Sequence, residues 1–223
     1  GGFVTNPVDW AKWIAVQLNK GALPDGTRLW SEARANEMWR PNIIVSSPGG
    51  PTPEAPGGAT AAPYATGWQV MDYRGERFIT HGGGAPGYLS GTVLLPGRNT
   101  GFSYFTNAEE SQLTRALRSG IADILMGKAG FDWIADAVRQ TTEGNAKSIA
   151  AAAEIDAKQA AGAVPSLPIA AYAGAWRDPW YGEIRIEERT TGRGRNRRTA
   201  LHLDFTRTKA LEGPLEPYDG ETF

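Results

Sequence analysis

The clearest chemical potential in this chain lies in residues 81–88, which read HGGGAPGY. They follow an apolar run that ends at Thr80 and precede a second apolar run that begins at Leu89, so two strands should flank them. The imidazole of His81 can gain or lose a proton near neutral pH. Three successive glycines allow another molecule to approach the backbone closely. Together these features predict one wall of an active site.

Two other interpretations of this segment deserve comparison. Gly82, Gly84 and Gly87 match the dinucleotide-binding pattern G-x-G-x-x-G, but that pattern must open a helix, whereas Pro86 and a β run follow here. The second interpretation is an ordinary tight hairpin in which His81 only satisfies a backbone group. Such a hairpin does not need three glycines, which cost stability through the entropy of the unfolded chain. The glycines favour a ligand against the backbone, and the hairpin interpretation stays open.

Four strands and a helix should form the framework around this segment. Short apolar runs, with turn residues at 74–76 and 96–99 between them, predict strands over 67–73, 77–81, 89–95 and 101–106. Asn107 is expected to cap the helix that follows. The expected apolar face of this helix consists of Leu113, Leu117, Ile121, Ile124 and Leu125. Consecutive strands followed by a helix predict an antiparallel sheet with a helix packed on it, which is an α+β fold.

Two helices and a long loop should precede these strands. Asn6 and Pro7 predict the start of a helix that Gly21 ends. A second, short helix is expected over 31–39. Residues 46–63 contain so many prolines and glycines that they exclude a regular helix or a central strand, so we expect a long loop there.

Beyond the sheet, the sequence predicts a helical stretch and then a second β region. A helical run should extend from Asp132 to about Ala161, and it is rich in alanine in its second half. Residues 182–187 and 200–205 alternate as half-buried strands do. The expected divisions are 1–128, the α+β domain, 129–164, a helical linker, and 165–223, a small and incomplete all-β domain.

The composition excludes several classes of function. A formal net charge of -1 favours neither nucleic acid nor a membrane surface, and no run of about 18 apolar residues could form a spanning helix. The chain has no cysteine, and His81 and His202 lie far apart, so we expect no metal site and no cofactor. The arginine-rich stretch 190–198 lacks the aromatic residues of a nucleic-acid surface and should be a solvated hairpin loop. Both chain ends are expected to be cuts through a larger protein.

Residues 78–88, FITHGGGAPGY, resemble the third motif of the serine β-lactamase-related hydrolases. This group includes class C β-lactamases, penicillin-binding proteins, D-aminopeptidases and related esterases, and its members carry Lys-Thr-Gly or His-x-Gly on this strand. Segments 1–13, 67–68 and 101–107 resemble, in the same order, the family's Gly-Gly entry into a helix and its closing sheet. The resemblance covers residues 1–128. It implies a partial β-lactamase/transpeptidase-like domain, in which helices flank an antiparallel sheet.

Two motifs of that family are missing from the sequence. Neither Ser-x-x-Lys, which carries the family's nucleophile, nor Tyr-x-Asn occurs, and there is no Gly-x-Ser-x-Gly either. In the family, both missing motifs lie upstream of the part seen here. The resemblance therefore implies the C-terminal part of a hydrolase, which needs the missing N-terminal segment of the same protein and should not catalyse acyl transfer alone.

The resemblance also implies roles for the residues of the motif. The N–H of Gly84 would donate to the oxyanion of a tetrahedral intermediate, and His81 would orient the substrate or help to move a proton. Gly82 and Gly83 would keep the strand edge open so that a substrate can lie along it. Tyr88 would line the pocket, although a plain core or surface aromatic residue is an equal alternative.

Two functions remain open at this point. The first is part of a serine hydrolase that acts on a β-lactam, a D-amino-acid peptide or an ester through an acyl-serine. The second is a non-catalytic binding or assembly module that retains the sheet. The expected partner is a small-molecule or peptide substrate, and the resemblance implies a periplasmic or secreted protein. Residues 172–182 resemble the start of the small β-barrel that is appended to many of these hydrolases.

Overall fold

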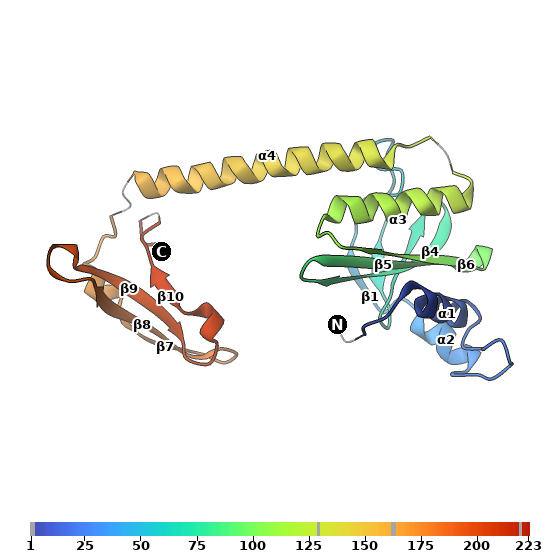
Figure 1. Cartoon of the computed structure of the whole chain (residues 1–223), viewed down its shortest axis with the longest axis horizontal. Coiled ribbons are helices and arrows are strands. Elements are labelled where there is room, and N and C mark those ends of the chain that lie inside the picture. Colours follow the sequence, from blue (N-terminus) through green and yellow to red (C-terminus); the bar gives the residue numbers. More distant parts are fainter. Residues whose placement is uncertain (1–2, 129, 162–163, 219) are drawn as a thin grey trace. The chain divides into compact units, whose positions relative to one another are not determined.

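The computed structural model describes residues 3–128, 130–161, 164–218 and 220–223. The chain forms two compact units, Gly1–Glu143 and Gly144–Phe223 (Figure 1). Each unit contains one antiparallel sheet, and the two are described separately below. No helix in the described part of the chain is both long and apolar enough to cross a membrane.

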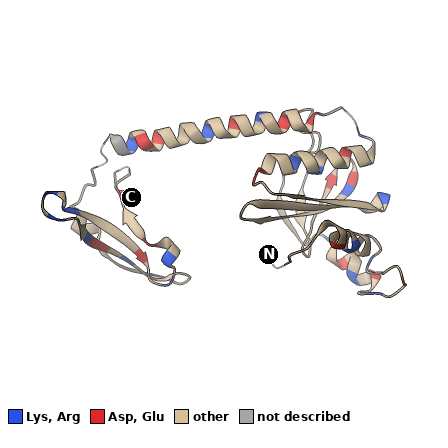
Figure 2. Cartoon of the chain, in the orientation of Figure 1, with Lys and Arg blue, Asp and Glu red and all other residues tan. Residues whose placement is uncertain are grey.

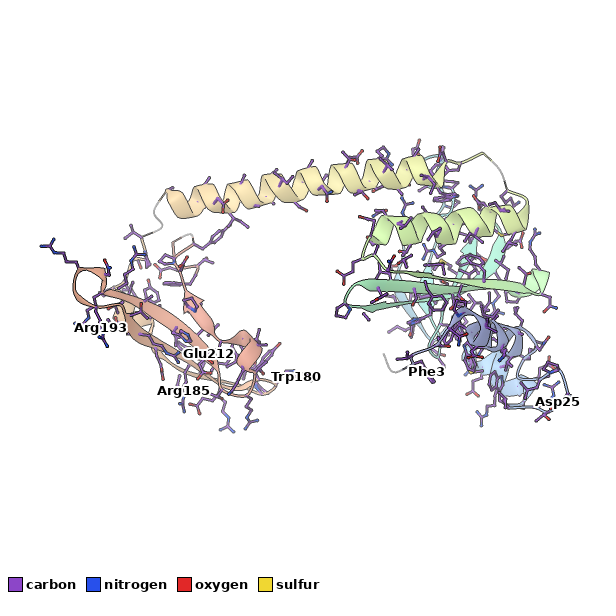
Figure 3. The ribbon with its side chains drawn as sticks, in the orientation of Figure 1. Phe3, Asp25, Trp180, Arg185, Arg193 and Glu212 are labelled. Carbon is purple, nitrogen blue, oxygen red and sulfur yellow. The ribbon has the colours of Figure 1, made fainter. Side chains whose placement is uncertain are left out.

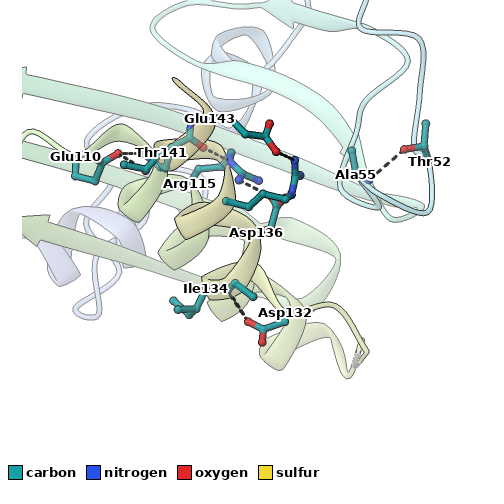
Figure 4. Close-up of polar contacts among 12 residues, drawn as sticks. Thr52, Ala55, Glu110, Arg115, Asp132, Ile134, Asp136, Thr141 and Glu143 are labelled. Atoms are coloured by element: carbon teal, nitrogen blue, oxygen red, sulfur yellow. Dashed lines mark hydrogen bonds and ion pairs between the residues drawn. The ribbon is translucent and has the colours of Figure 1, made fainter. Parts of the chain in front are cut away.

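The sheet of the first unit has six strands in the order β1-β2-β3-β4-β5-β6, and each strand is antiparallel to its neighbours. The strands are β1 (Ile43–Ser46), β2 (Ala62–Tyr64), β3 (Gln69–Tyr73), β4 (Glu76–Ala85), β5 (Tyr88–Leu95) and β6 (Thr100–Thr106), with a short 3-10 helix η1 (Pro96–Arg98) before β6. The four predicted strands are confirmed. β1 and β2 were not predicted. The expectation that residues 46–63 hold no central strand is wrong at their end, because β2 begins at Ala62 and lies between β1 and β3; Pro63 is tolerated there because it pairs with Ile44 of β1 alone, and only Tyr64 pairs with β3. In the rest of that loop, the only β pairing among the described residues is the isolated bridge between Thr52 and Ala55 (Figure 4).

Helices α1 (Pro7–Leu18) and α2 (Glu32–Met38) form as their N-terminal residues predict. The Asn6 side chain accepts a hydrogen bond from the Asp9 N–H at 3.0 Å, and Ser31 caps α2 in the same way. Helix α1 ends at Leu18, earlier than predicted, because Lys20 as well as Gly21 has a positive φ, at which a right-handed helix cannot continue. Ile14 of α1 packs in a buried cluster with Trp39, Ala65, Trp68, Val70, Ile79 and Leu94.

Helix α3 (Ser111–Met126) covers the opposite face of the sheet (Figure 1). Phe78 packs in the cluster under α3 and Ile79 in the cluster under α1, as expected for consecutive residues of one strand. The residues of the cluster under α3 are Tyr73, Phe78, Val93, Leu95, Ala116, Ala122, Met126, Trp133 and Ala137. The predicted α+β fold, an antiparallel sheet flanked by helices and followed by a small all-β unit, is therefore confirmed.

The predicted cap and the predicted apolar face of α3 are both wrong. The side chain of Glu110, rather than that of Asn107, accepts a hydrogen bond at the start of the helix, from the Gln112 N–H at 2.9 Å. The helix buries Ala116, Ser119, Ala122, Asp123 and Met126. Ile124 is instead 78% exposed. Small side chains let this face approach the sheet closely, and the hydrogen bonds of Asp123 hold it there.

Asp123 is the centre of a buried polar network in the first unit. Its carboxylate accepts hydrogen bonds from Tyr73 Oη at 3.0 Å and Trp133 Nε1 at 2.8 Å, and it forms an ion pair with Arg74 Nη2 at 2.9 Å. Burial, together with the negative charge of Asp123, raises the pKa of Tyr73 to about 12. The network ties the β3–β4 turn, α3 and the residue that opens the next helix to one another.

Helix α4 (Trp133–Ala160) begins in the first unit and ends in the second. The Asp132 side chain accepts hydrogen bonds from the N–H groups of Ile134 and Ala135, at 3.1 and 2.9 Å. Asp136 lies between Arg115 and Arg139, each at 2.5 Å (Figure 4). Burial raises the pKa of Asp136, but hydrogen bonds and charges from the two arginines outweigh burial and lower it. The predicted helical run is confirmed.

The second unit contains a four-stranded antiparallel sheet in the order β10-β9-β8-β7. Its strands are β7 (Gly174–Asp178), β8 (Gly182–Thr191), β9 (Arg198–Phe205) and β10 (Gly213–Leu215), and its 3-10 helices are η2 (Ile169–Tyr172), η3 (Gly194–Asn196) and η4 (Lys209–Leu211). Arg193 lies in the exposed β8–β9 loop, as predicted, and Trp180 is 86% exposed in the β7–β8 turn (Figure 3). A closed barrel and the domain boundaries drawn from the sequence stay predictions.

Candidate functional site

The strand β4 has an open edge where the histidine and glycines lie. Up to Thr80 it pairs with β3 on one side and β5 on the other. From His81 to Ala85 it pairs with β5 alone among the described strands. Alternate residues of an unpaired antiparallel edge direct both their N–H and C=O groups outwards. An extended peptide or acyl amide can form backbone hydrogen bonds along such an edge.

The three glycines belong to this strand and not to the turn, which corrects the prediction that the strand ends at His81. The turn is made by Pro86 and Gly87, and Gly87 has a φ of +81°. A Cβ atom added to Gly82 would meet nothing closer than 3.5 Å, and none of the three glycines has a positive φ. The fold itself therefore gives no steric reason for glycine at position 82.

A cavity of about 530 Å³ lies beside this strand. Its lining residues from β4 and β5 are His81, Gly82, Gly83, Gly84, Ser90 and Thr92, and those from other elements are Phe3, Thr5, Trp10, Trp13, Gln17, Met38, Thr66, Gly67, Trp68 and Phe105. None of these residues is Asp, Glu, Lys or Arg, and Figure 2 shows that β5 and β6 carry no such charge along their length. The cavity therefore suits an uncharged group with an apolar part.

Helix α1 presents its aromatic side chains to this cavity. Trp10 Nε1 donates a hydrogen bond to Thr92 Oγ1 at 2.7 Å, which fixes one indole ring against β5. Gln17, two helical turns along the same face, is buried, and neither its amide nitrogen nor its amide oxygen has a partner among the described residues. Buried amides are usually hydrogen-bonded. The Gln17 amide is thus an unpaired polar group in a mostly apolar wall.

The imidazole of His81 makes two hydrogen bonds. Its Nδ1 lies 2.6 Å from the carbonyl oxygen of Gly82, and its Nε2 lies 3.0 Å from Tyr64 Oη. The first contact is the one that the hairpin interpretation expected. His81 is nevertheless exposed and lines the cavity, so it meets the geometric requirement of both interpretations. Tyr64 is not among the predicted site residues, because it follows the expected loop on a strand that was not predicted.

The other predicted site residues are distributed as follows. Gly82, Gly83 and Gly84 come together with His81 at the cavity, and their roles stay predictions. Tyr88 begins β5 opposite Ala85, is 61% exposed, and is not among the residues that line the described cavity. No group of three or more His, Cys, Asp or Glu side chains that could hold a metal ion occurs within the described residues.

A family model identifies the family of the first part of the chain. The family model described as "Beta-lactamase" matches residues 1–125, and one described as "Domain of unknown function (DUF3471)" matches residues 158–223. The chain is 26% identical over 196 residues to the Unguisins hydrolase ungD' of Aspergillus campestris (strain IBT 28561). This match covers 83% of this chain and 34% of that protein.

A solved structure was also found in these comparisons. The octameric penicillin-binding protein homologue from Pyrococcus abyssi has a TM-score of 0.42 and 16% sequence identity, over 87% of this chain and 36% of that one. The chain thus spans about a third of the length of each of these two proteins.

Proposed function

Because this chain belongs to the beta-lactamase family, we propose that it supplies the substrate-binding and oxyanion wall of a serine hydrolase. The enzyme would cleave an amide or ester bond, in a β-lactam, a D-amino-acid peptide or an ester, through an acyl-serine intermediate. The observation that carries this proposal is the open edge of β4, where His81 and three glycines line an uncharged cavity. A relative named as a hydrolase supports the same reaction class.

The proposed reaction divides the work between two segments. A serine from an upstream segment with the Ser-x-x-Lys motif attacks the substrate carbonyl carbon and passes its proton to a neighbouring base. The carbonyl oxygen becomes an oxyanion, to which the Gly84 N–H donates a hydrogen bond. The leaving group departs with a proton, and water then releases the acyl group from the serine. His81 orients the substrate or assists one of these proton transfers.

The 223 residues by themselves are proposed to be inactive, because their sequence contains neither Ser-x-x-Lys nor Tyr-x-Asn. The partners are then an amide or ester substrate and the nucleophile-bearing segment of the same protein, in a periplasmic or secreted enzyme. The alternative is a binding or assembly module without chemistry. If the reading frame that encodes the whole protein contains neither motif upstream of these residues, only that alternative remains.

The substitution Gly83→Ala tests whether a substrate lies on this strand. Gly83 lies on the same face of β4 as His81, two residues away, so a methyl group there would project toward the cavity. We expect the acylation rate of the protein that includes the nucleophile segment to fall about 10²-fold, since a small displacement of bound substrate has effects of that order. The rate is measured by stopped-flow mixing with a chromogenic ester.

The matched control is Gly97→Ala, in η1. A Cβ atom there meets nothing within 4 Å. In Gly83→Ala the new methyl group would lie 2.8 Å from Ser90 Oγ, a hydroxyl that can rotate away, so the melting temperature should stay close to that of the unsubstituted protein. If Gly83→Ala acylates as fast as Gly97→Ala, no substrate passes over this strand and the proposal fails.

A further inference from the structure

Tyr64 and His81 form a pair that the proposed function does not yet use. Tyr64 ends β2, where it pairs with Ile43 of β1 and Gln69 of β3, so its backbone is held from both sides. Its carbonyl oxygen also accepts a hydrogen bond from the Asn42 N–H at 2.9 Å. The Tyr64 side chain is half-buried, and its ring meets the imidazole edge to face, with ring centres 5.9 Å apart and planes at 64°.

The two contacts of His81 define which ring nitrogen carries the hydrogen. The carbonyl oxygen of Gly82 can only accept, so the Nδ1 atom that faces it at 2.6 Å must carry a hydrogen. In a neutral imidazole the other nitrogen, Nε2, then has a free lone pair. Tyr64 Oη, at 3.0 Å from Nε2, must therefore donate its hydrogen to the histidine.

We propose that Tyr64 is a positioning residue for His81, which holds the imidazole in the Nδ1–H tautomer and in one orientation at the cavity wall. The role in the reaction rests on the proposed function, whereas the tautomer does not. The imidazole is exposed, so packing alone would not fix its ring. Two hydrogen bonds on opposite sides of the ring do so. Any proton that His81 accepts must arrive at Nε2, the atom to which Tyr64 Oη is hydrogen-bonded.

The tautomer can be measured directly in the 223-residue chain. A long-range ¹H–¹⁵N correlation spectrum at a pH of about 8.5, where imidazole side chains are neutral, separates a protonated ring nitrogen from one with a free lone pair. The chain has two histidines, so the spectrum has two sets of signals. We expect His81 to show a protonated Nδ1 and an unprotonated Nε2. In Tyr64→Phe we expect a mixture of both tautomers.

Two controls accompany this measurement. His202 lies on β9 and contacts Arg189 Nη1 through its Nε2 at 3.1 Å, a contact that Tyr64→Phe does not alter, so its signals should not change and serve as an internal reference. Tyr181→Phe, which removes a phenolic hydroxyl from the second unit, should leave the His81 tautomer as it was. A protonated Nε2 on His81 in the unsubstituted chain, or an unchanged tautomer in Tyr64→Phe, would overturn the proposal.

The role in the reaction needs the protein that includes the nucleophile segment. There, Tyr64→Phe should lower the limiting acylation rate constant about 10-fold, while the ester concentration that gives half of that rate stays the same. An unchanged rate constant, together with a changed tautomer, would overturn the positioning role. If the unsubstituted protein itself forms no acyl-enzyme, the proposed function fails, and the tautomer result still decides whether Tyr64 holds His81.

Discussion

Asp123→Asn is expected to lower the free energy of unfolding of the first unit by about 3–5 kcal/mol, because it breaks a buried ion pair and leaves one partner unpaired. Three donors, from Tyr73, Arg74 and Trp133, converge on the Asp123 carboxylate. An asparagine side chain offers a single acceptor oxygen, and its amide group would face at least one of these donors. Chemical denaturation followed by tryptophan fluorescence measures the effect.

The matched control for this substitution is Asp72→Asn. Asp72 lies next to Tyr73 on β3 but is exposed, so the same chemical change should stay within about 0.5 kcal/mol of the unsubstituted protein. Equal stability of the two variants would show that the network around Asp123 does not hold α3, the β3–β4 turn and Trp133 together.

His81→Ala should slow acylation about 10²-fold in the protein that includes the nucleophile segment, without loss of the fold. The side chain is exposed, so its removal leaves no cavity in the core. Its loss removes both the hydrogen bond from Tyr64 and the only imidazole among the residues that line the described cavity. Single-turnover kinetics with an activated ester measure the acylation step.

His202→Ala is the control for this substitution, because it removes the other histidine, on β9 of the second unit. It should leave acylation unchanged. If His81→Ala also acylates at the normal rate, the imidazole only satisfies the Gly82 carbonyl group, as the hairpin interpretation holds, and the histidine has no part in the reaction.

The sequence predicts the central strands well because their signals are local. Short apolar runs end just before His81 and begin just after Tyr88, as in strands that are buried on both faces, and the pairing of β4 with β5 follows from the short turn between them. The continuation of β4 through three glycines was not predictable, since glycine weakens a strand and gives no alternation. Its pairing with β5 supplies what the local sequence lacks.

The rest of the fold depends on contacts between residues far apart in sequence. Helix α3 carries two stripes at helical spacing, one with Leu117 and Ile121 and one with Ala116, Ser119 and Asp123. Periodicity alone favoured the stripe with the larger apolar side chains. Tyr64 follows a proline-rich segment whose composition predicts only a loop. Its contact with His81, 17 positions later, is set by the register of the sheet, which the local sequence does not reveal.

The most direct test of the central claim is acyl-serine labelling of two proteins, this chain alone and the same chain together with its upstream segment. A fluorescent penicillin and a fluorophosphonate serve as probes, and mass spectrometry of the labelled peptides locates the modified residue. We expect no label on the 223-residue chain, and one label on the serine of an upstream Ser-x-x-Lys motif in the longer protein. A label on this chain alone, or a longer protein that carries both missing motifs but reacts with neither probe, would contradict the account.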